Sequence, residues 1–292
     1  MTRTEKTARY IDPTSDFGFK RIFSTAPNKD LLISFINELF RGRKHVVDLT
    51  YDKNELVGDT ENQGAVILDL TCTSSDGKKF VLEVQRTPQI NFKQRIIYYG
   101  SKLIADQAPK GKRREWGYTI PEVYIIVLMD GFSMPGDEPS EQYLHEICLC
   151  NRQTGKVFYE HLEFIYIELV NFVKEEADLQ SDLDGWLFVL KNMSKLNRIP
   201  VYFRKPIFEK LFNISEYSKL SKEEKHMYDI SLKRKWDEEA IRIYQEQSLA
   251  DAKREGEKNK ALAIAKEMKK EGISLEQIIK FTKLTEKDIE NL

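Results

Sequence analysis

The sequence of 292 residues is poor in several of the residues that common functional sites require. Its three cysteines, Cys72, Cys148 and Cys150, are too few for a disulfide framework, and we assign them to strands. Cys148 and Cys150, separated by one residue, are a poor zinc site. No apolar run is long enough to cross a membrane, and the polar N-terminus lacks a signal-peptide core. We therefore expect a cytoplasmic protein without a membrane partner.

The sequence also has few histidines and no excess of positive over negative charge. None of the four histidines stands in a recognisable motif with a nucleophilic serine or cysteine. The absence of a glycine-rich phosphate loop argues against a kinase or a nucleotide-hydrolysing motor. The formal net charge is -1, whereas neutralising a nucleic-acid backbone requires local positive charge. Any nucleic-acid binding must therefore depend on cations that are clustered in particular segments.

The most informative stretch consists of two runs that alternate between apolar and polar residues. These runs, 67–72 and 79–85, enclose the pair Asp76-Gly77, which is a strong hairpin signal between alternating hydrophobics. A two-residue loop would mix charged and apolar residues on both faces. A three-residue loop over 75–77, in which Gly77 adopts the positive φ of a bulge, keeps them apart. We predict this second register, because a one-residue slip would scramble the apolar face.

In the predicted register, Asp69 faces Glu83 across the hairpin, and Ile67 faces Gln85. The opposite face is then apolar and suited to a core, with Leu68, Leu70, Cys72, Phe80, Leu82 and Val84. Two opposed carboxylates repel each other unless a cation lies between them. Mg²⁺ suits such a pair, because it takes one or two protein carboxylates and bridges to phosphate oxygens. A surface hairpin with solvated acids and no ligand stays the alternative.

Asp69, the glycine turn and Glu83-x-Gln85 resemble the metal-binding core of the PD-(D/E)XK nucleases. Within that superfamily, the chain resembles the recombination-promoting nucleases or putative transposases over nearly its whole length. The other segments that carry the resemblance are 16–23, the motif Phe92-x-x-Arg95-x-x-Tyr98-Tyr99, 164–169 and 272–274. The resemblance implies a restriction-endonuclease-like α/β core, ordered as helix, three strands, helix and strand, with a helical C-terminal extension.

The same resemblance implies a Mg²⁺-dependent DNA endonuclease associated with recombination or mobile elements. Asp69, Glu83 and the backbone carbonyl of Val84 would bind the metal, and Asp69, Glu83 and Gln85 would be catalytic. Gln85 stands where the wider superfamily often has lysine, so a hydrogen-bond donor remains but a positive charge is lost. A nuclease fold that binds DNA or protein without turnover is therefore the alternative. Transposition has less support, because no third carboxylate stands at a convincing spacing.

Basic residues near the hairpin are the predicted contacts to DNA phosphates. Lys93 and Arg95 open the helix that follows the hairpin. The loop before the next strand contributes Lys112, Arg113 and Arg114. An ordinary solvated loop stays the alternative for this segment. In the opening motif, we expect Asp16 and Lys20 to orient the helix of the active site.

Periodicity divides the chain into a nuclease-like core over 10–175, a helical subdomain over 176–235 that packs on it, and a charged tail over 236–292. The helices and strands predicted for the core are 28–41, 46–51, 91–108, 123–129, 143–150 and 164–169. In the tail, the sequence over 236–271 predicts a long helix with a weak heptad seam. A homo-oligomer could form through this helix, and a solvent-exposed helix without a partner is the alternative. Gly272 ends it. Ser274 with Gln277 predicts a capping box, and Thr285 caps another short helix.

Overall fold

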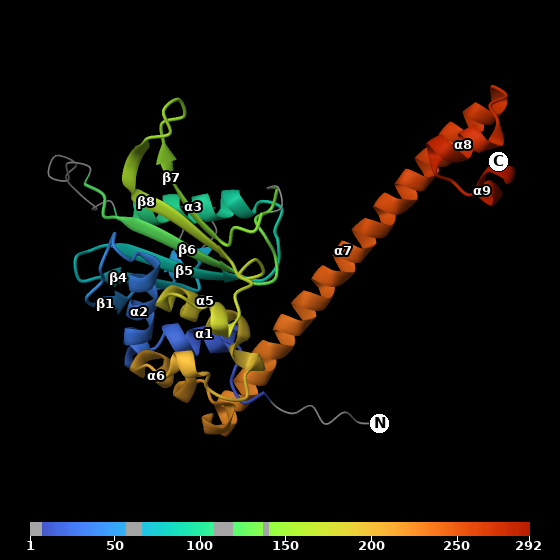
Figure 1. Ribbon diagram of the computed structural model, residues 1–292. Helices are drawn as coiled ribbons and strands as arrows, with labels where there is room; N and C mark the ends of the chain where they lie inside the picture. The colour runs from blue at the N-terminus through green and yellow to red at the C-terminus, as the bar shows by residue number, and fades with distance from the viewer. Residues whose placement is uncertain (1–7, 57–65, 108–118, 137–139) are drawn as a thin grey trace. The chain divides into compact units, whose positions relative to one another are not determined.

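The computed structural model describes residues 8–56, 66–107, 119–136 and 140–292, and its centre is a six-stranded sheet of order β1-β4-β5-β6-β8-β7 (Figure 1). The strands are β1 (Leu49–Tyr51), β4 (Leu70–Ser74), β5 (Lys79–Gln85), β6 (Val123–Met129), β7 (Leu144–Cys150) and β8 (Val157–Glu168). β6 runs parallel to β5 and to β8, and the other pairs are antiparallel. A short separate hairpin, β2 (Glu55–Leu56) and β3 (Val66–Ile67), precedes β4.

Helices cover both faces of the sheet, as Figure 1 shows. The helices on one face are α1 (Asp16–Phe23), α2 (Lys29–Leu39), α5 (Asp182–Asn192) and α6 (Pro206–Ile214). The other face carries α3 (Phe92–Asp106). The order α2, β1, β4, β5, α3, β6 is the predicted sequence of helix, three strands, helix and strand. The predicted α/β fold class is therefore confirmed.

Each face of the sheet has its own apolar core, and β6 contributes to both. Every residue of β6 is buried, as its continuous apolar sequence predicts for a central parallel strand. Tyr124 and Ile126 pack in the core shared with α1, α2, α5 and α6, whereas Ile125 packs in the core under α3. Residues of α5 and α6 are buried in the same core as α1 and α2, so the segment 182–214 packs against the sheet. The end of β5 carries Glu83 and Gln85, two residues of the site.

The β4–β5 hairpin has the predicted three-residue loop. Leu70 pairs with Leu82, and Thr73 pairs with Lys79, which places residues 75–77 in the loop. Gly77 adopts a φ of 86°, a conformation that glycine reaches without steric cost. The side chains of Leu70 and Leu82 are buried in the core that contains α2. The register that brings Asp69 towards Glu83 therefore follows from the local sequence.

Two details of the predicted hairpin are wrong. Ile67 does not face Gln85 but pairs with Glu55 in the separate β2–β3 hairpin. Leu68 packs in the core under α3, opposite to the face predicted for it. The reason is a bend at Asp69, before β4 begins at Leu70, which interrupts the alternation of side chains between the faces.

The C-terminal part of the chain is helical but differs from the prediction at its ends. Helix α7 (Lys222–Lys270) begins 14 residues before the predicted start at Trp236, because its first turns pack Tyr228 against Ile11 and Leu220. Gly272 ends it with a φ of 74°. Helices α8 (Leu275–Thr282) and α9 (Glu286–Glu290) follow. The side chain of Ser274 makes no capping hydrogen bond, whereas Thr285 forms a capping box with Asp288.

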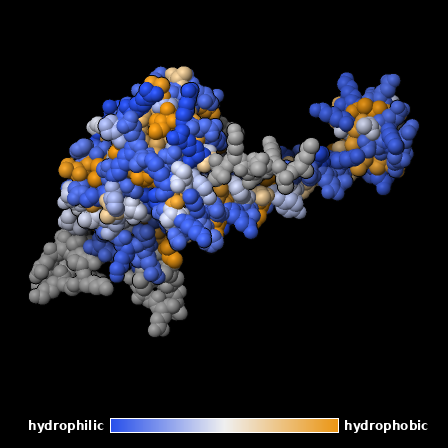
Figure 2. All heavy atoms as spheres, turned by 90° about the horizontal axis from the view of Figure 1, so that it is seen from below, coloured by the Kyte–Doolittle hydropathy of each residue, from blue (hydrophilic) through white to orange (hydrophobic). Residues whose placement is uncertain are grey.

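The chain forms two compact units, residues 1–236 and 237–292. In the second unit, a small core joins the end of α7 to α8 and α9 through Ala265, Ile278, Leu284 and Ile289. The face of the molecule in Figure 2 is mostly hydrophilic, with apolar residues in small patches. Homo-oligomer formation through α7 stays a prediction. No helix in the described part of the chain is long and apolar enough to cross a membrane.

Candidate metal centre

Asp69 and Glu83 are interlocked by hydrogen bonds where β4 begins and β5 nears its end. The backbone N–H of Asp69 donates to Oε1 of Glu83 over 2.9 Å. In return, the backbone N–H of Val84 donates to Oδ2 of Asp69 over 2.8 Å. Glu83 is 3% exposed and Asp69 is half-buried. The structure thus brings the two predicted acids together in a site largely shielded from bulk water.

Asn54 holds the bend that places Asp69. Its side-chain Nδ2 donates to the carbonyl oxygen of Asp69 over 3.0 Å, and its Oδ1 accepts from the N–H of Thr71 over 3.0 Å. The backbone carbonyl of Asn54 accepts from the N–H of Leu68. Sequence reasoning missed this residue, since asparagine is common in turns and its partners lie 14 to 17 positions away in the chain.

Burial makes the two carboxylates costly to ionise in the metal-free protein. Burial, and then the charge of Asp69, raise the pKa of Glu83 to about 8. Burial also raises the pKa of Asp69, although the hydrogen bond from Val84 acts in the opposite direction. A cation bound between the carboxylates would relieve both effects, because it favours their charged forms.

The atoms around the pair suit a hard divalent cation. Carboxylate and carbonyl oxygens are the ligands that such ions prefer. The carbonyl of Gln85 accepts from Asp130 on the β6 side, and successive residues of a strand direct their backbone groups to opposite edges. The carbonyl of Val84 therefore points to the edge where Asp69 lies. Among the residues that the structure describes, no three His, Cys, Asp or Glu side chains gather as a metal cluster. Two carboxylates and one carbonyl would leave positions for water and phosphate.

Gln85 connects Glu83 to the first turns of α3. Its Nε2 donates to Oε2 of Glu83 over 3.1 Å, and its Oε1 accepts from Nη2 of Arg95. The guanidinium carbon of Arg95 also lies 5.6 Å from the ring centre of Tyr99. Lys93 lies in the first turn of the same helix. The predicted contacts Lys112, Arg113 and Arg114 lie outside the described residues.

The opening motif also lies near the acids. Asp16 and Lys20 form an ion pair of 2.8 Å on α1. The charge of Asp16 raises the pKa of Asp69, whereas the charges of Arg86 and Lys20 lower it, so all three lie within electrostatic range of Asp69. The orienting role of Asp16 and Lys20 stays a prediction, and Arg86 is a nearby cation that sequence reasoning missed.

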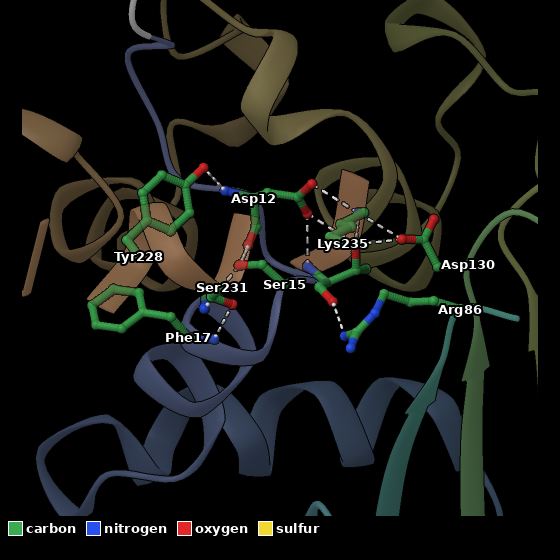
Figure 3. A network of polar contacts seen from close by, with 10 residues as sticks. Asp12, Ser15, Phe17, Arg86, Asp130, Tyr228, Ser231 and Lys235 are labelled. Atoms are coloured by element: carbon green, nitrogen blue, oxygen red, sulfur yellow. Dashed lines mark hydrogen bonds and ion pairs between the residues drawn. The ribbon is translucent and has the colours of Figure 1, made fainter. Parts of the chain in front are cut away.

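A partly buried ion network lies on this side of the site, as Figure 3 shows. Lys235 at its centre lies 2.8 Å from Oδ2 of Asp12 and 2.6 Å from Oδ2 of Asp130, and it donates to Oγ1 of Thr14. Arg86, which follows β5, donates to the backbone carbonyl of Thr14 over 3.2 Å. Burial alone would raise the pKa of Asp130, but the charge of Lys235 lowers it. The network thus joins the start of the chain, the end of β6 and α7.

Comparison with known families identifies the family of this chain. A family model described as PD-(D/E)XK nuclease family transposase matches residues 13–244. The chain belongs to this family. The match includes Asp69, Glu83, Gln85 and Lys235, and it ends before α8 and α9. Nucleases of the PD-(D/E)XK family generally use divalent metals, and membership implies DNA as the substrate. Neither a curated protein nor a solved structure matches the chain closely enough to add to this assignment.

The raised pKa of Glu83 leads to a prediction about pH and metal. Folding raises the pKa of Glu83 from about 4.5 to about 8. Its contribution to the free energy of unfolding is therefore fully present below pH 4.5 and is lost as the pH rises through about 8. The loss is on the order of 3 to 5 kcal/mol. We expect Mg²⁺ to offset it, so millimolar Mg²⁺ should raise the melting temperature more at pH 8 than at pH 5.

Thermal melts at both pH values, with and without Mg²⁺, measure this effect. The matched control is the double variant Asp69→Asn with Glu83→Gln, whose melting temperature should not respond to Mg²⁺ at either pH. Equal responses of the wild-type protein and the double variant would show that Mg²⁺ binds elsewhere.

Proposed function

We propose that this protein is a Mg²⁺-dependent endonuclease that hydrolyses phosphodiester bonds of DNA during recombination or the movement of mobile elements. The observation that carries the proposal is the interlocked pair of carboxylates, the half-buried Asp69 and the buried Glu83, whose ionisation burial opposes. A fold that needed only stability would gain from apolar residues at these positions, because an uncompensated buried charge is costly. A bound divalent cation would compensate the negative charges of both carboxylates.

Each residue of the site has a distinct role in this proposal. Asp69, Glu83 and the carbonyl of Val84 would hold the metal, which would supply a Lewis acid that polarises a phosphate and lowers the pKa of bound water. Gln85 keeps Oε2 of Glu83 in place through its Nε2. Lys93 and Arg95, on the first turns of α3, contact the DNA phosphates. Lys112, Arg113 and Arg114 extend this contact.

A second candidate function is DNA binding without turnover. The observation that favours it is Gln85, which removes a positive charge from the site and with it one source of electrostatic stabilisation for the transition state. The distribution of charge at the site decides between the two functions, because the fold is the same in both.

Incubation of the purified protein with supercoiled plasmid DNA tests the proposal. We expect nicked and linear DNA in the presence of Mg²⁺ and intact plasmid in the presence of EDTA. Gel electrophoresis over a time course measures the rate, and a parallel filter-binding measurement shows whether DNA is bound. Binding without cleavage under all divalent metals tested would favour the second function.

A further inference from the structure

The site lacks a positive charge at position 85 but has one on the neighbouring helix. We propose that Arg95 of α3 supplies the cation that position 85 lacks, donating hydrogen bonds to the phosphate that is cleaved. This inference rests on the proposed endonuclease function. It makes Arg95 a catalytic residue with a defined position relative to Glu83, rather than one of several general contacts to DNA.

The contacts of Gln85 place the guanidinium of Arg95 beside the acid pair. A guanidinium only donates hydrogen bonds, so the amide oxygen of Gln85 must face Arg95, and the amide N–H is left to donate to Glu83. Its Nε2 faces Glu83 over 3.1 Å, and its Oε1 faces Arg95. A lysine at position 85 would instead place two cations in contact. Gln85 and Arg95 therefore suit each other as a pair that carries a single positive charge.

Arg95 keeps hydrogen-bond donors for a ligand. A guanidinium has five N–H groups. One N–H of Nη2 is used by Gln85, and one of Nη1 is used by Gln89. The Nε of Arg95 is buried and has no acceptor among the residues that the structure describes. One N–H on each of Nη1 and Nη2 remains for a ligand, and a phosphate oxygen is the acceptor that a guanidinium matches best.

The side chain of Arg95 is also held in place. Phe92 and Ile96, on either side of it in α3, are buried in the core under the helix, and the ring of Tyr99 lies against its guanidinium. Other nearby cations have different partners: Lys20 pairs with Asp16, and Arg86 donates to the carbonyl of Thr14. Arg95 is the cation that Gln85 links to Glu83.

A charge-relocation experiment tests the inference. We expect Arg95→Gln to lower kcat at saturating DNA by about 10²- to 10³-fold, as removal of one transition-state donor does. The double variant Arg95→Gln with Gln85→Lys returns a cation to the site and should recover at least about tenfold of that loss. Arg95→Lys keeps the charge but has fewer donors, so its kcat should lie between those of the wild type and Arg95→Gln.

Further measurements separate this role from folding and from simple DNA affinity. Arg95→Gln should keep the increase in melting temperature caused by Mg²⁺, because Asp69 and Glu83 are intact. Arg152→Gln, an exposed arginine in the turn between β7 and β8, is the matched control and should cleave like the wild type. If the wild type cleaves DNA and Arg95→Gln keeps the wild-type kcat but has a raised KM, the role of Arg95 is overturned and the proposed function is not. A wild type that never cleaves DNA would overturn the proposed function as well.

Discussion

Replacement of Asp69 by Asn, or of Glu83 by Gln, is expected to lower Mg²⁺-dependent cleavage of DNA by about 10³-fold or more. A metal at this site contributes several kcal/mol of charge stabilisation, and about 1.4 kcal/mol corresponds to a factor of ten in rate. An amide in place of a carboxylate is a poor ligand for Mg²⁺ and removes one negative charge from the ligand set. Cleavage rates of supercoiled plasmid under saturating Mg²⁺ measure the effect.

These substitutions should not unfold the protein, because the amides preserve the acceptors of the interlocked pair. In Asp69→Asn, the side-chain oxygen of the new amide could still accept from the N–H of Val84. In Glu83→Gln, the amide oxygen could accept from the N–H of Asp69, whereas the hydrogen bond from Nε2 of Gln85 would be lost because two N–H donors would face each other. Glu83→Gln should even raise the melting temperature of the metal-free protein at pH 8, where the ionised carboxylate costs most.

Asp76→Asn is the matched control for these variants. Asp76 lies in the loop of the same hairpin and contacts Lys78, so its substitution should leave the cleavage rate near that of the wild type. Asp69→Asn and Glu83→Gln proteins that fold, lose the response to Mg²⁺ and still cut DNA at the wild-type rate would rule out the proposed metal centre.

Replacement of Lys235 by Met is expected to lower the free energy of unfolding of the first unit by about 3 to 5 kcal/mol. The side chain of Lys235 is 16% exposed and contacts two carboxylates, those of Asp12 and Asp130. Its removal leaves these two acids close together without the cation between them. Denaturant titration at pH 7, followed by tryptophan fluorescence, measures the change because Trp186 is buried in the core of this unit.

Two comparisons identify the ion network as the cause. Lys219→Met removes a half-exposed lysine that pairs with Glu216, and it should cost about 1 kcal/mol or less. Adding Asp130→Asn to Lys235→Met should recover part of the loss, because it removes one of the two repelling charges. A cost for Lys235→Met no larger than that for Lys219→Met would contradict this account.

The pH dependence of the network has the opposite sign to that of Glu83. The pKa of Asp130 is lowered in the folded protein, so its contribution is present above the unfolded pKa near 3.8 and is lost as the pH falls through the folded value. The difference in stability between wild type and Lys235→Met should therefore shrink in acid. Between pH 5 and pH 8 it should stay nearly constant.

The local sequence by itself determined the elements that form the centre of the site. Alternation and an Asp-Gly turn set the β4–β5 register, and the unbroken apolar run of 123–129 set β6, because these signals act between neighbouring residues. The pairing of Asp69 with Glu83 followed from that register. The resemblance to a nuclease family then rested on residues whose spacing the hairpin explains.

Only the tertiary structure decided how the surroundings of these acids are built. The bend at Asp69 depends on Asn54, and the position of Arg95 depends on how α3 packs across the sheet. The network around Lys235 joins residues more than 100 positions apart in the chain. Such contacts leave no periodic signal in the sequence, because they arise when separate elements pack and bring buried charges to a common point.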